Sequence, residues 1–225
     1  MNERCVVLDI GGVLEITPAT GWDRAWEERL GLPPGALDER LHDVWEAGEV
    51  GAITEPQVRA RIAARLGIDA HRTDALMADL WTEYLGSPNE ELIAHVRTLR
   101  SRCRLGILSN SFVGATEREE QRYHFGELVD EIVYSHEIGV RKPDPRAFEV
   151  TCDRLAVRPA DCLFVDDCAV NIEAAEAFGM RAVLFTENAE VMARVTEHLR
   201  TLEAGPPQAG SSQPGRPEEE RAWSC

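Results

Sequence analysis

Three short apolar runs in this chain each end in polar side chains of the kind that carry out chemistry. Asp9 follows the run CVVL at 5–8, Ser109 and Asn110 follow LGIL at 105–108, and Asp166 and Asp167 follow CLFV at 162–165. If the runs are parallel strands, their carboxyl ends share one edge of a sheet, where open α/β folds bind ligands. The spacing therefore predicts a single polar site built from three distant segments.

The carboxylates of this predicted site need a positive partner. Asp166 and Asp167 are adjacent, and a third carboxylate, Asp9, is expected beside them. Carboxylates this close repel one another unless a cation lies between them. Magnesium accepts a few carboxylate oxygens and keeps several waters, so it fits such a site. An alternative reading makes one of the two adjacent aspartates the N-cap of a following helix, which accounts for one carboxylate but not for both.

Lys142 is the only lysine in a chain that contains 23 arginines. Lysine is a compact point charge, whereas arginine is a broad planar fork. A tight cleft that holds a carboxylate and a phosphate together would favour the smaller head group. Pro143 and Pro145 restrict the backbone just after it and favour a helix start there. We therefore take Lys142 as a candidate site residue.

The elements that must position these residues follow an α/β rhythm. A fourth apolar run, AVLF at 182–185, joins the three above, and helical patterns are predicted over 89–100, 145–155 and 169–178, the last closed by Gly179. Continuous apolar runs are typical of strands covered on both faces, and their alternation with helices indicates a parallel sheet. We predict a Rossmann-like α/β core formed by residues 1–14 and 88–203.

Residues 15–87 interrupt this rhythm with helical patterns alone. Thr54 and Gln57 have the spacing of a capping box, and Trp22, Trp26 and Trp45 recur in helical patterns. We expect an all-helical cap inserted after the first strand. We place the three tryptophans in the core of this cap and disfavour a role as a ligand platform.

Composition limits the partners that can be expected. The net charge is -16, which disfavours nucleic acid, and no apolar run is long enough to span a membrane. The six cysteines form no C-x-x-C pair and no secretory signal is visible, so we expect a cytoplasmic protein with reduced thiols. Residues 204–225, rich in proline, glycine and glutamate, are predicted to be a disordered tail, with a short docking peptide around Trp223 as the alternative. Nothing in the sequence indicates an oligomeric state.

Four motifs together resemble those of the haloacid dehalogenase-like hydrolases. They are LDIGGVL at 8–14, LSNS at 108–111, RKPDP at 141–145 and FVDD at 164–167 with Asn171 and Gly179. Their order and spacing agree with the family over residues 5–200, with a helical cap after the first motif. Within the family, the chain is most similar to bacterial sugar-phosphate phosphatases with a D-x-G first motif. The resemblance implies a Mg²⁺-dependent phosphatase that acts on a small phosphorylated metabolite.

The resemblance also implies a role for each site residue. Asp9 is the expected nucleophile and forms an aspartyl-phosphate. The expected magnesium ligands are Asp9, the backbone carbonyl of Gly11 and Asp167, with Asp166 as the second carboxylate of the pair. Phosphate oxygens are expected to be held by Ser109, Asn110 and Lys142, and Lys142 is also expected to orient Asp9.

One position departs from the family pattern. The residue two places after the nucleophile is ordinarily a second aspartate that protonates the leaving group, and here it is Gly11. Such acid–base help is worth ~10²–10⁴-fold. We hypothesise a preference for leaving groups that need little protonation, such as acyl phosphates or anomeric sugar phosphates. Glu15 is a candidate substitute acid, although we favour its interpretation as a solvated residue at the cap hinge.

Two other functions remain open at this point. A 2-haloacid dehalogenase would use the same aspartate to attack carbon, but it needs no metal, and the two adjacent carboxylates argue against it. A family member that binds a phosphorylated ligand or a protein without turnover would explain Gly11. Magnesium-dependent turnover and halide release distinguish the three.

Overall fold

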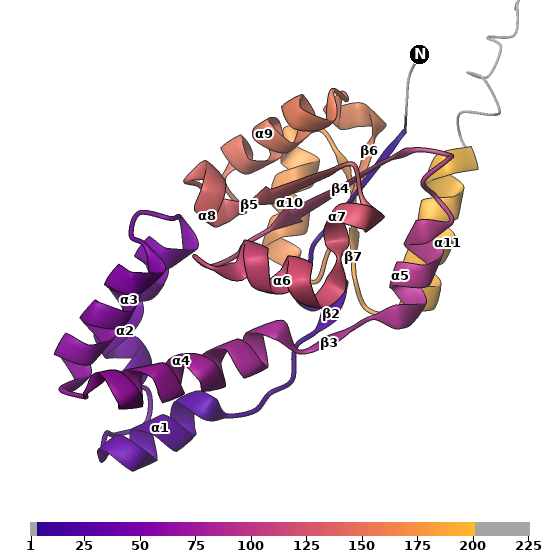
Figure 1. Ribbon diagram of the computed structural model, residues 1–225. Coiled ribbons are helices and arrows are strands. Elements are labelled where there is room, and N and C mark those ends of the chain that lie inside the picture. Colours follow the sequence, from indigo (N-terminus) through magenta and orange to yellow (C-terminus); the bar gives the residue numbers. More distant parts are fainter. Residues whose placement is uncertain (1–3, 201–225) are drawn as a thin grey trace, which may run out of the picture.

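The computed structural model describes residues 4–200, and the tail predicted at 204–225 lies outside the described residues. Its centre is a five-stranded parallel sheet in the order β5-β4-β1-β6-β7 (Figure 1). The strands are β1 (Cys5–Leu8), β4 (Arg104–Ser109), β5 (Glu131–Tyr134), β6 (Cys162–Asp166) and β7 (Arg181–Leu184). Because β1 lies between β4 and β6, the three polar strand ends are neighbours, as predicted.

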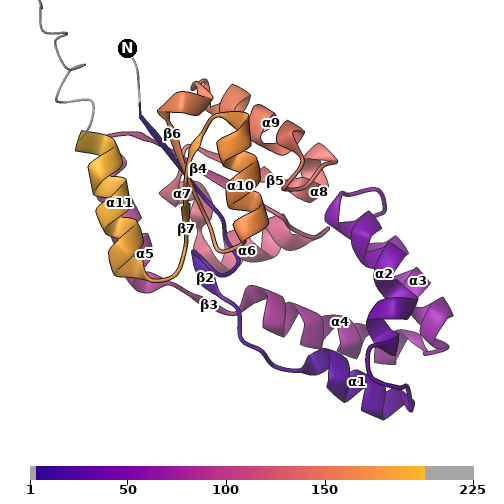
Figure 2. The ribbon, with the colours of Figure 1, turned by 180° about the vertical axis from the view of Figure 1, so that it is seen from behind.

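Helices cover both faces of this sheet, which explains why its central strands are continuously apolar. Strand residues such as Val6 and Leu8 pack with α5 (Glu90–Arg97), α7 (Phe125–Leu128) and α11 (Asn188–Arg200). Alternate residues such as Val7 and Phe164 pack on the other face with α9 (Pro145–Leu155) and α10 (Ala169–Phe178). Figures 1 and 2 show α5 and α11 side by side on one face of the sheet. The predicted three-layer α/β core is confirmed.

The sequence patterns located some elements well and missed others. The bounds of α9 and α10 agree with the predictions, and Gly179 ends α10 in the left-handed conformation, with φ 100°. The edge strand β5 was missed because it is only 4 residues long and two of them are only partly buried, so its apolar pattern is weak. The short helices α6 (Ala115–Tyr123) and α8 (Ser135–Ile138) and the 3-10 helix Pro159–Asp161 were also not predicted.

Four helices form the insert that follows the first strand. They are α1 (Trp22–Leu30), α2 (Ala36–Glu49), α3 (Glu55–Leu66) and α4 (Ala70–Leu85). The capping box predicted at the start of α3 is present, with both Thr54 and Gln57 in their expected roles. Two short antiparallel strands, β2 (Glu15–Ile16) and β3 (Ser87–Pro88), connect the cap to the core. The division of the chain at 14/15 and 87/88 stays a prediction, although these two strands lie at those points.

The cap touches the core at a second place, the carboxyl end of α2. The Ser135 hydroxyl donates to the carbonyl of Glu49 at 2.7 Å, and the amide of Val113 donates to the carbonyl of Gly48 at 3.2 Å. A Cβ at position 48 would lie 2.2 Å from the ring of Phe112, so glycine permits this close approach. The cap is therefore held to the core on both sides of the sheet edge that carries the polar residues.

The prediction that the three tryptophans belong to the cap core is confirmed for Trp26, and Trp22 and Trp45 pack against that core. Trp26 is 3% exposed and belongs to the cap core. Trp22 and Trp45 are only partly buried, and both line a cavity between cap and core. Among the described residues, no helix is both long and apolar enough to cross a membrane.

Candidate active site

The side chain of Lys142 connects two of the three predicted aspartates. Its ammonium group lies 2.8 Å from Asp9 Oδ2 and 2.7 Å from Asp166 Oδ2, and it donates to the carbonyl of Leu108 at 2.9 Å. An ammonium has three protons, so these three partners use all of its donors. Lys142 is 2% exposed, and its positive charge offsets the negative charges of the two carboxylates.

The loop that carries Lys142 is fixed by the residue after β4. The Lys142 amide donates to Asn110 Oδ1 at 2.8 Å, and Asn110 Nδ2 donates back to the Lys142 carbonyl at 2.9 Å. Asn110 therefore positions the lysine, a role that the sequence analysis did not assign. Ser109 is the last residue of β4 and is 2% exposed. The phosphate-binding roles expected for Ser109, Asn110 and Lys142 stay predictions.

Asp166 is enclosed by protein donors. It has no exposed surface, and besides Lys142 it accepts from the Cys168 amide at 2.8 Å and from Asn171 Nδ2 at 3.0 and 3.1 Å. Both of its oxygens are therefore occupied. The side chain acts as a fixed negative charge that holds Lys142 beside Asp9.

Asp9 and Asp167 are the carboxylates with room for a further partner. Within residues 4–200, the Asp9 oxygens have two hydrogen-bond partners, the Lys142 ammonium and the Ile10 amide, and Asp167 is exposed. Burial raises the pKa of Asp9 above its ordinary value, while the Lys142 charge opposes this rise. Burial and the neighbouring Asp166 also raise the pKa of Asp167. Both carboxyls are therefore in positions where a bound cation would stabilise the ionised form.

The surroundings of Asp167 fit a small hard cation. Oxygens of Asp9, Asp166 and Asp167 lie within 4.8 Å of one another. Gly12 has φ 71°, and a Cβ there would lie 2.1 Å from Asp167 Oδ2, so only glycine leaves the carboxylate its place. Three carboxylates in one cluster with a single lysine leave an excess of negative charge, which suits a divalent ion bound by oxygen.

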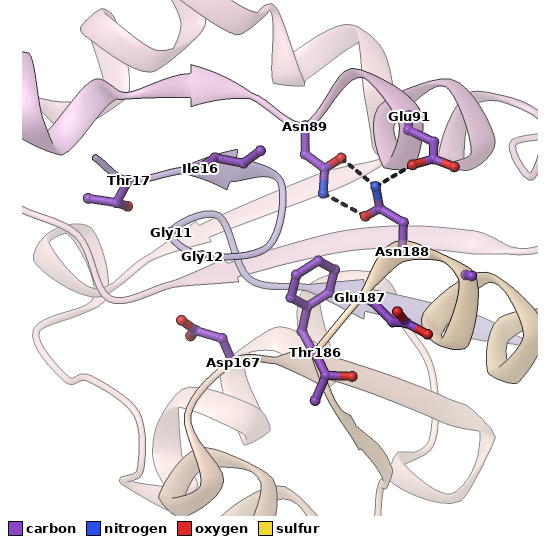
Figure 3. A pocket seen from close by; sticks show the side chains of 12 residues that line it. Gly11, Gly12, Ile16, Thr17, Asn89, Glu91, Asp167, Thr186, Glu187 and Asn188 are labelled. Carbon is purple, nitrogen blue, oxygen red and sulfur yellow. Dashed lines mark hydrogen bonds between the residues drawn. The ribbon is translucent and has the colours of Figure 1, made fainter. Parts of the chain in front are cut away.

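The exposed side of this cluster opens into a cavity of about 740 Å³ (Figure 3). Asp167 lies across it from Gly11 and Gly12, with Thr17 beside them. At its far side Asn89 and Asn188 exchange hydrogen bonds of 2.8 and 3.0 Å. These amides join the start of α5 to the start of α11 and fix the wall of the cavity.

Asp167, Glu91 and Glu187 line this cavity, but among residues 4–200 no carboxylate lies within 4 Å of a Cβ placed on Gly11. The nearest heavy atom to a Cβ placed on Gly11 is the Thr17 hydroxyl oxygen, at 4.0 Å. That hydroxyl donates to Glu15 Oε2 at 2.6 Å. Glu15 lies at the hinge as expected but is not solvated, because it is only 1% exposed, and burial raises its pKa to about 7. No sequence pattern indicates this burial, since an isolated glutamate after an apolar run is ordinarily exposed.

A second cavity, of about 440 Å³, lies between the cap and the loops after β4 and β5. Its core side is formed by Asn110, Ser111, Phe112 and Arg141, and its cap side by residues of α1, α2 and α4. No sequence pattern predicts this cavity, because its lining comes from five separate segments. Two of its lining residues, Asn110 and Arg141, are the sequence neighbours of the predicted site residues Ser109 and Lys142.

Comparison with known sequences agrees with this geometry. Residues 3–179 match the sequence profile of the haloacid dehalogenase-like hydrolases. The chain belongs to this family. It is therefore a hydrolase, and the motifs quoted above are those of a haloacid dehalogenase-like hydrolase with a helical cap.

Relatives of this hydrolase include proteins named as phosphatases. It is 29% identical to the phosphatase MT3486 of Mycobacterium tuberculosis over 91% of this chain and 97% of that protein. It is 32% identical to the phosphoglycolate phosphatase of Cereibacter sphaeroides, but over only 53% of this chain and 57% of that one. An (S)-2-haloacid dehalogenase of Pseudomonas sp. is 44% identical over a quarter of each chain.

Solved structures support the fold. A predicted HAD-like hydrolase from Porphyromonas gingivalis superposes with a TM-score of 0.74 at 22% identity, covering 89% of this chain and 99% of that chain. A HAD family enzyme from Bacteroides thetaiotaomicron, crystallised with magnesium and inorganic phosphate, gives 0.68 at 20% identity, covering 82% and 94%.

Proposed function

We propose that this hydrolase is a magnesium-dependent phosphatase that acts on a small phosphorylated metabolite through an aspartyl-phosphate on Asp9. The observation that carries the proposal is the division of roles among the three carboxylates. Asp166 is fully occupied by Lys142 and Asn171, whereas Asp167 is exposed at the mouth of a cavity beside Asp9. An uncompensated Asp167 would repel an anionic substrate, so the site needs a cation before a phosphate can enter.

The reaction would then proceed in two displacements. An Asp9 oxygen attacks phosphorus, the bond from phosphorus to the leaving oxygen breaks, and the alcohol leaves as an alkoxide that takes a proton from water. Water then attacks the acyl phosphate, giving inorganic phosphate and free Asp9. Lys142 holds Asp9 by the 2.8 Å contact to Oδ2 and the Ile10 amide donates to Oδ1 at 2.8 Å, so each oxygen keeps a second lone pair for the attack or for the cation.

The chain offers a set of groups that would hold magnesium. Asp167 and Asp9 would supply carboxylate oxygens and Gly11 its carbonyl, with Asp166 behind them as a second negative charge. When bound, the ion neutralises charge on the transferred phosphoryl group. The magnesium and phosphate bound by the similar Bacteroides enzyme support this assignment.

The test is release of phosphate from acetyl phosphate, p-nitrophenyl phosphate and glucose 1-phosphate, with magnesium or with EDTA. Turnover should require magnesium and should fall by at least about 10³-fold in Asp9→Asn. Asp153→Asn is a matched control, because it changes the same group at an exposed position of α9. A simple alkyl phosphate, added as a fourth substrate, should react more slowly than acetyl phosphate, because its leaving group needs the proton donor that is missing at position 11.

Two results would contradict the proposal. Halide release from 2-chloropropionate without metal would indicate a dehalogenase. Magnesium-independent binding of phosphate esters with no turnover on any of these substrates would indicate a binding protein that lost activity with the acid at position 11.

A further inference from the structure

The cavity between cap and core has a wall of aromatic side chains. Trp22 of α1, Trp45 of α2, Tyr84 of α4 and Phe112 of the core all line it. The Trp22 and Trp45 rings meet at 81° with centroids 6.5 Å apart, and Trp45 meets Phe112 at 62° and 5.9 Å. Rings at such steep angles present surfaces in different directions, as in the aromatic cages that bind alkylated ammonium ions.

This cavity adjoins the reaction centre. Asn110 lines it and holds the backbone of Lys142, and Arg141 lines it one residue before Lys142. Lys142, whose backbone Asn110 holds, contacts Asp9 Oδ2 at 2.8 Å. A phosphate ester bound at Asp9 would therefore place its alcohol half in this cavity.

The charges around the cavity are strongly one-sided. Five carboxylates line it, from Asp23, Asp38, Glu46, Glu49 and Glu83, and Arg141 is its single arginine. Arg141 is already paired, with Glu49 in a close contact and with Glu46 at 3.6 Å. Asp23, Asp38 and Glu83 form no ion pair with any residue between 4 and 200. His42 also lines the cavity and lies 3.6 Å from Glu46, so an anionic alcohol half would meet five carboxylates and two basic side chains that already face carboxylates.

We propose that the alcohol half of the substrate carries a positive charge, as an alkylated ammonium group held between the aromatic wall and the unpaired carboxylates. This inference rests on the proposed phosphatase activity and specifies its substrate class, a phosphate monoester of an amino alcohol. Aromatic faces and carboxylates both attract such a cation, and the apolar groups on its nitrogen suit the ring surfaces.

A positive charge on the substrate would also compensate for the lack of a proton-donating side chain at Gly11. When the ester bond breaks, the leaving oxygen becomes an alkoxide that must take its proton from water. An ammonium group two carbons away stabilises this alkoxide electrostatically and makes it a better leaving group. The alkoxide left by an uncharged alcohol would receive no such help beside the same carboxylates.

The experiment compares kcat/KM in magnesium for choline phosphate, its neutral isostere 3,3-dimethylbutyl phosphate and anionic phosphoglycolate. Acetyl phosphate is included because its small leaving group does not reach the cavity and so reports the reaction centre alone. We expect choline phosphate to exceed the neutral isostere by at least about tenfold, the usual order of a desolvated cation–π site. Phosphoglycolate should be the poorest of the three.

Charge variants locate the effect in the cavity. Asp38→Asn should reduce the preference for choline phosphate over the isostere about threefold, the size of one charge pair a few ångströms apart in water. Glu39→Gln is the matched control, since it lies beside Asp38 in the first turn of α2 but does not line the cavity. Acetyl phosphate turnover should be unchanged in Glu39→Gln, and in Asp38→Asn it gives the general loss of activity against which the choline preference is compared.

Each outcome separates the two proposals. Turnover of acetyl phosphate with equal or greater activity on the neutral isostere or on phosphoglycolate overturns the cationic substrate and leaves the phosphatase intact. A choline preference that is the same in Asp38→Asn as in the wild type overturns the assignment to this cavity. Failure to hydrolyse acetyl phosphate and all three esters overturns the phosphatase, and the inference with it.

Discussion

Replacing Lys142 with methionine tests whether its charge holds the active site together. The side chain is fully buried and lies 2.8 Å from Asp9 and 2.7 Å from Asp166. Methionine has a similar length but no charge, so two buried carboxylates lose their shared partner. Asp166 retains Asn171 and the Cys168 amide, whereas Asp9 retains only the Ile10 amide.

The expected cost follows from this burial. Removal of one partner from a buried ion pair destabilises proteins by roughly 3–5 kcal/mol. For a chain of this size, each kcal/mol lowers the melting temperature by about 2–4 °C, so a decrease of roughly 10 °C is expected at pH 8. Arg141→Met is the matched control. Its ion pairs are partly exposed, at 44% for the arginine side chain, and should contribute less than about 1 kcal/mol.

The pH dependence gives the deciding measurement. Burial already raises the pKa of Asp9, and loss of Lys142 removes the charge that opposes this rise. A carboxyl whose folded pKa lies above its unfolded value stabilises the protein at low pH and loses that contribution as pH rises. The destabilisation by Lys142→Met should therefore be smallest near pH 4.5 and increase towards pH 8.

Thermal unfolding of wild type, Lys142→Met and Arg141→Met at these two pH values, with EDTA or magnesium, completes the assay. Magnesium should raise the melting temperature of Lys142→Met more than that of the wild type, since it replaces part of the lost charge. Equal melting temperatures for Lys142→Met and Arg141→Met at pH 8, or a destabilisation that shrinks as pH rises, would refute this account of the site.

Three further changes test neighbouring features. Gly12→Ala should cost at least about 1 kcal/mol in thermal unfolding because of its left-handed backbone, and should weaken magnesium binding by calorimetry because the methyl group displaces Asp167. Asp167→Asn should raise the dissociation constant for magnesium while leaving the melting temperature in EDTA within a few degrees, since this side chain is exposed; a loss of folding would contradict this. Burial raises the pKa of Glu119 to about 7. Between pH 4.5 and pH 7 the unfolded carboxyl is ionised and the folded one is not, so the free energy of unfolding of the wild type should decrease by roughly 3 kcal/mol. In Glu119→Gln this slope should flatten in urea titrations, and an unchanged slope would assign the loss to other groups.

The sequence predicted those parts of the site that depend on strand ends. Asp9, Ser109 and Asp166 are each placed by an apolar run, and three parallel strands with neighbouring carboxyl ends bring them together. Lys142 was predicted because it is the only lysine in the sequence and because Pro143 and Pro145 restrict the backbone after it. The family resemblance already implied that Lys142 orients Asp9, whereas its contact with Asp166, 24 residues away, required the fold.

Other features depend on contacts that leave no local pattern. Trp22 and Trp45 have the helical spacing of core residues, and only the docking of α1 and α2 over the loop after β4 turns them towards a cavity. Glu15 appears as an ordinary hinge glutamate, and its burial arises because β3 pairs with β2 and brings Gly86 against it. Such features require pairs of segments that are distant in sequence, which periodicity cannot reveal.

Asp166 and Asp167 are adjacent and identical, but the end of β6 places them in different surroundings. Successive side chains of a strand point to opposite sides. Asp166, the last residue of β6, is turned into the protein and has no exposed surface, whereas Asp167 follows it into the open cavity. The first is satisfied by Lys142 and Asn171 and gives the site a fixed charge; the second is available to a cation. A carboxylate in the place of Asp166 needs these buried donors, and the open cavity needs a carboxylate in the place of Asp167 to bind a cation. Asp166→Asn and Asp167→Asn should therefore differ, the first reducing stability and the second chiefly metal affinity.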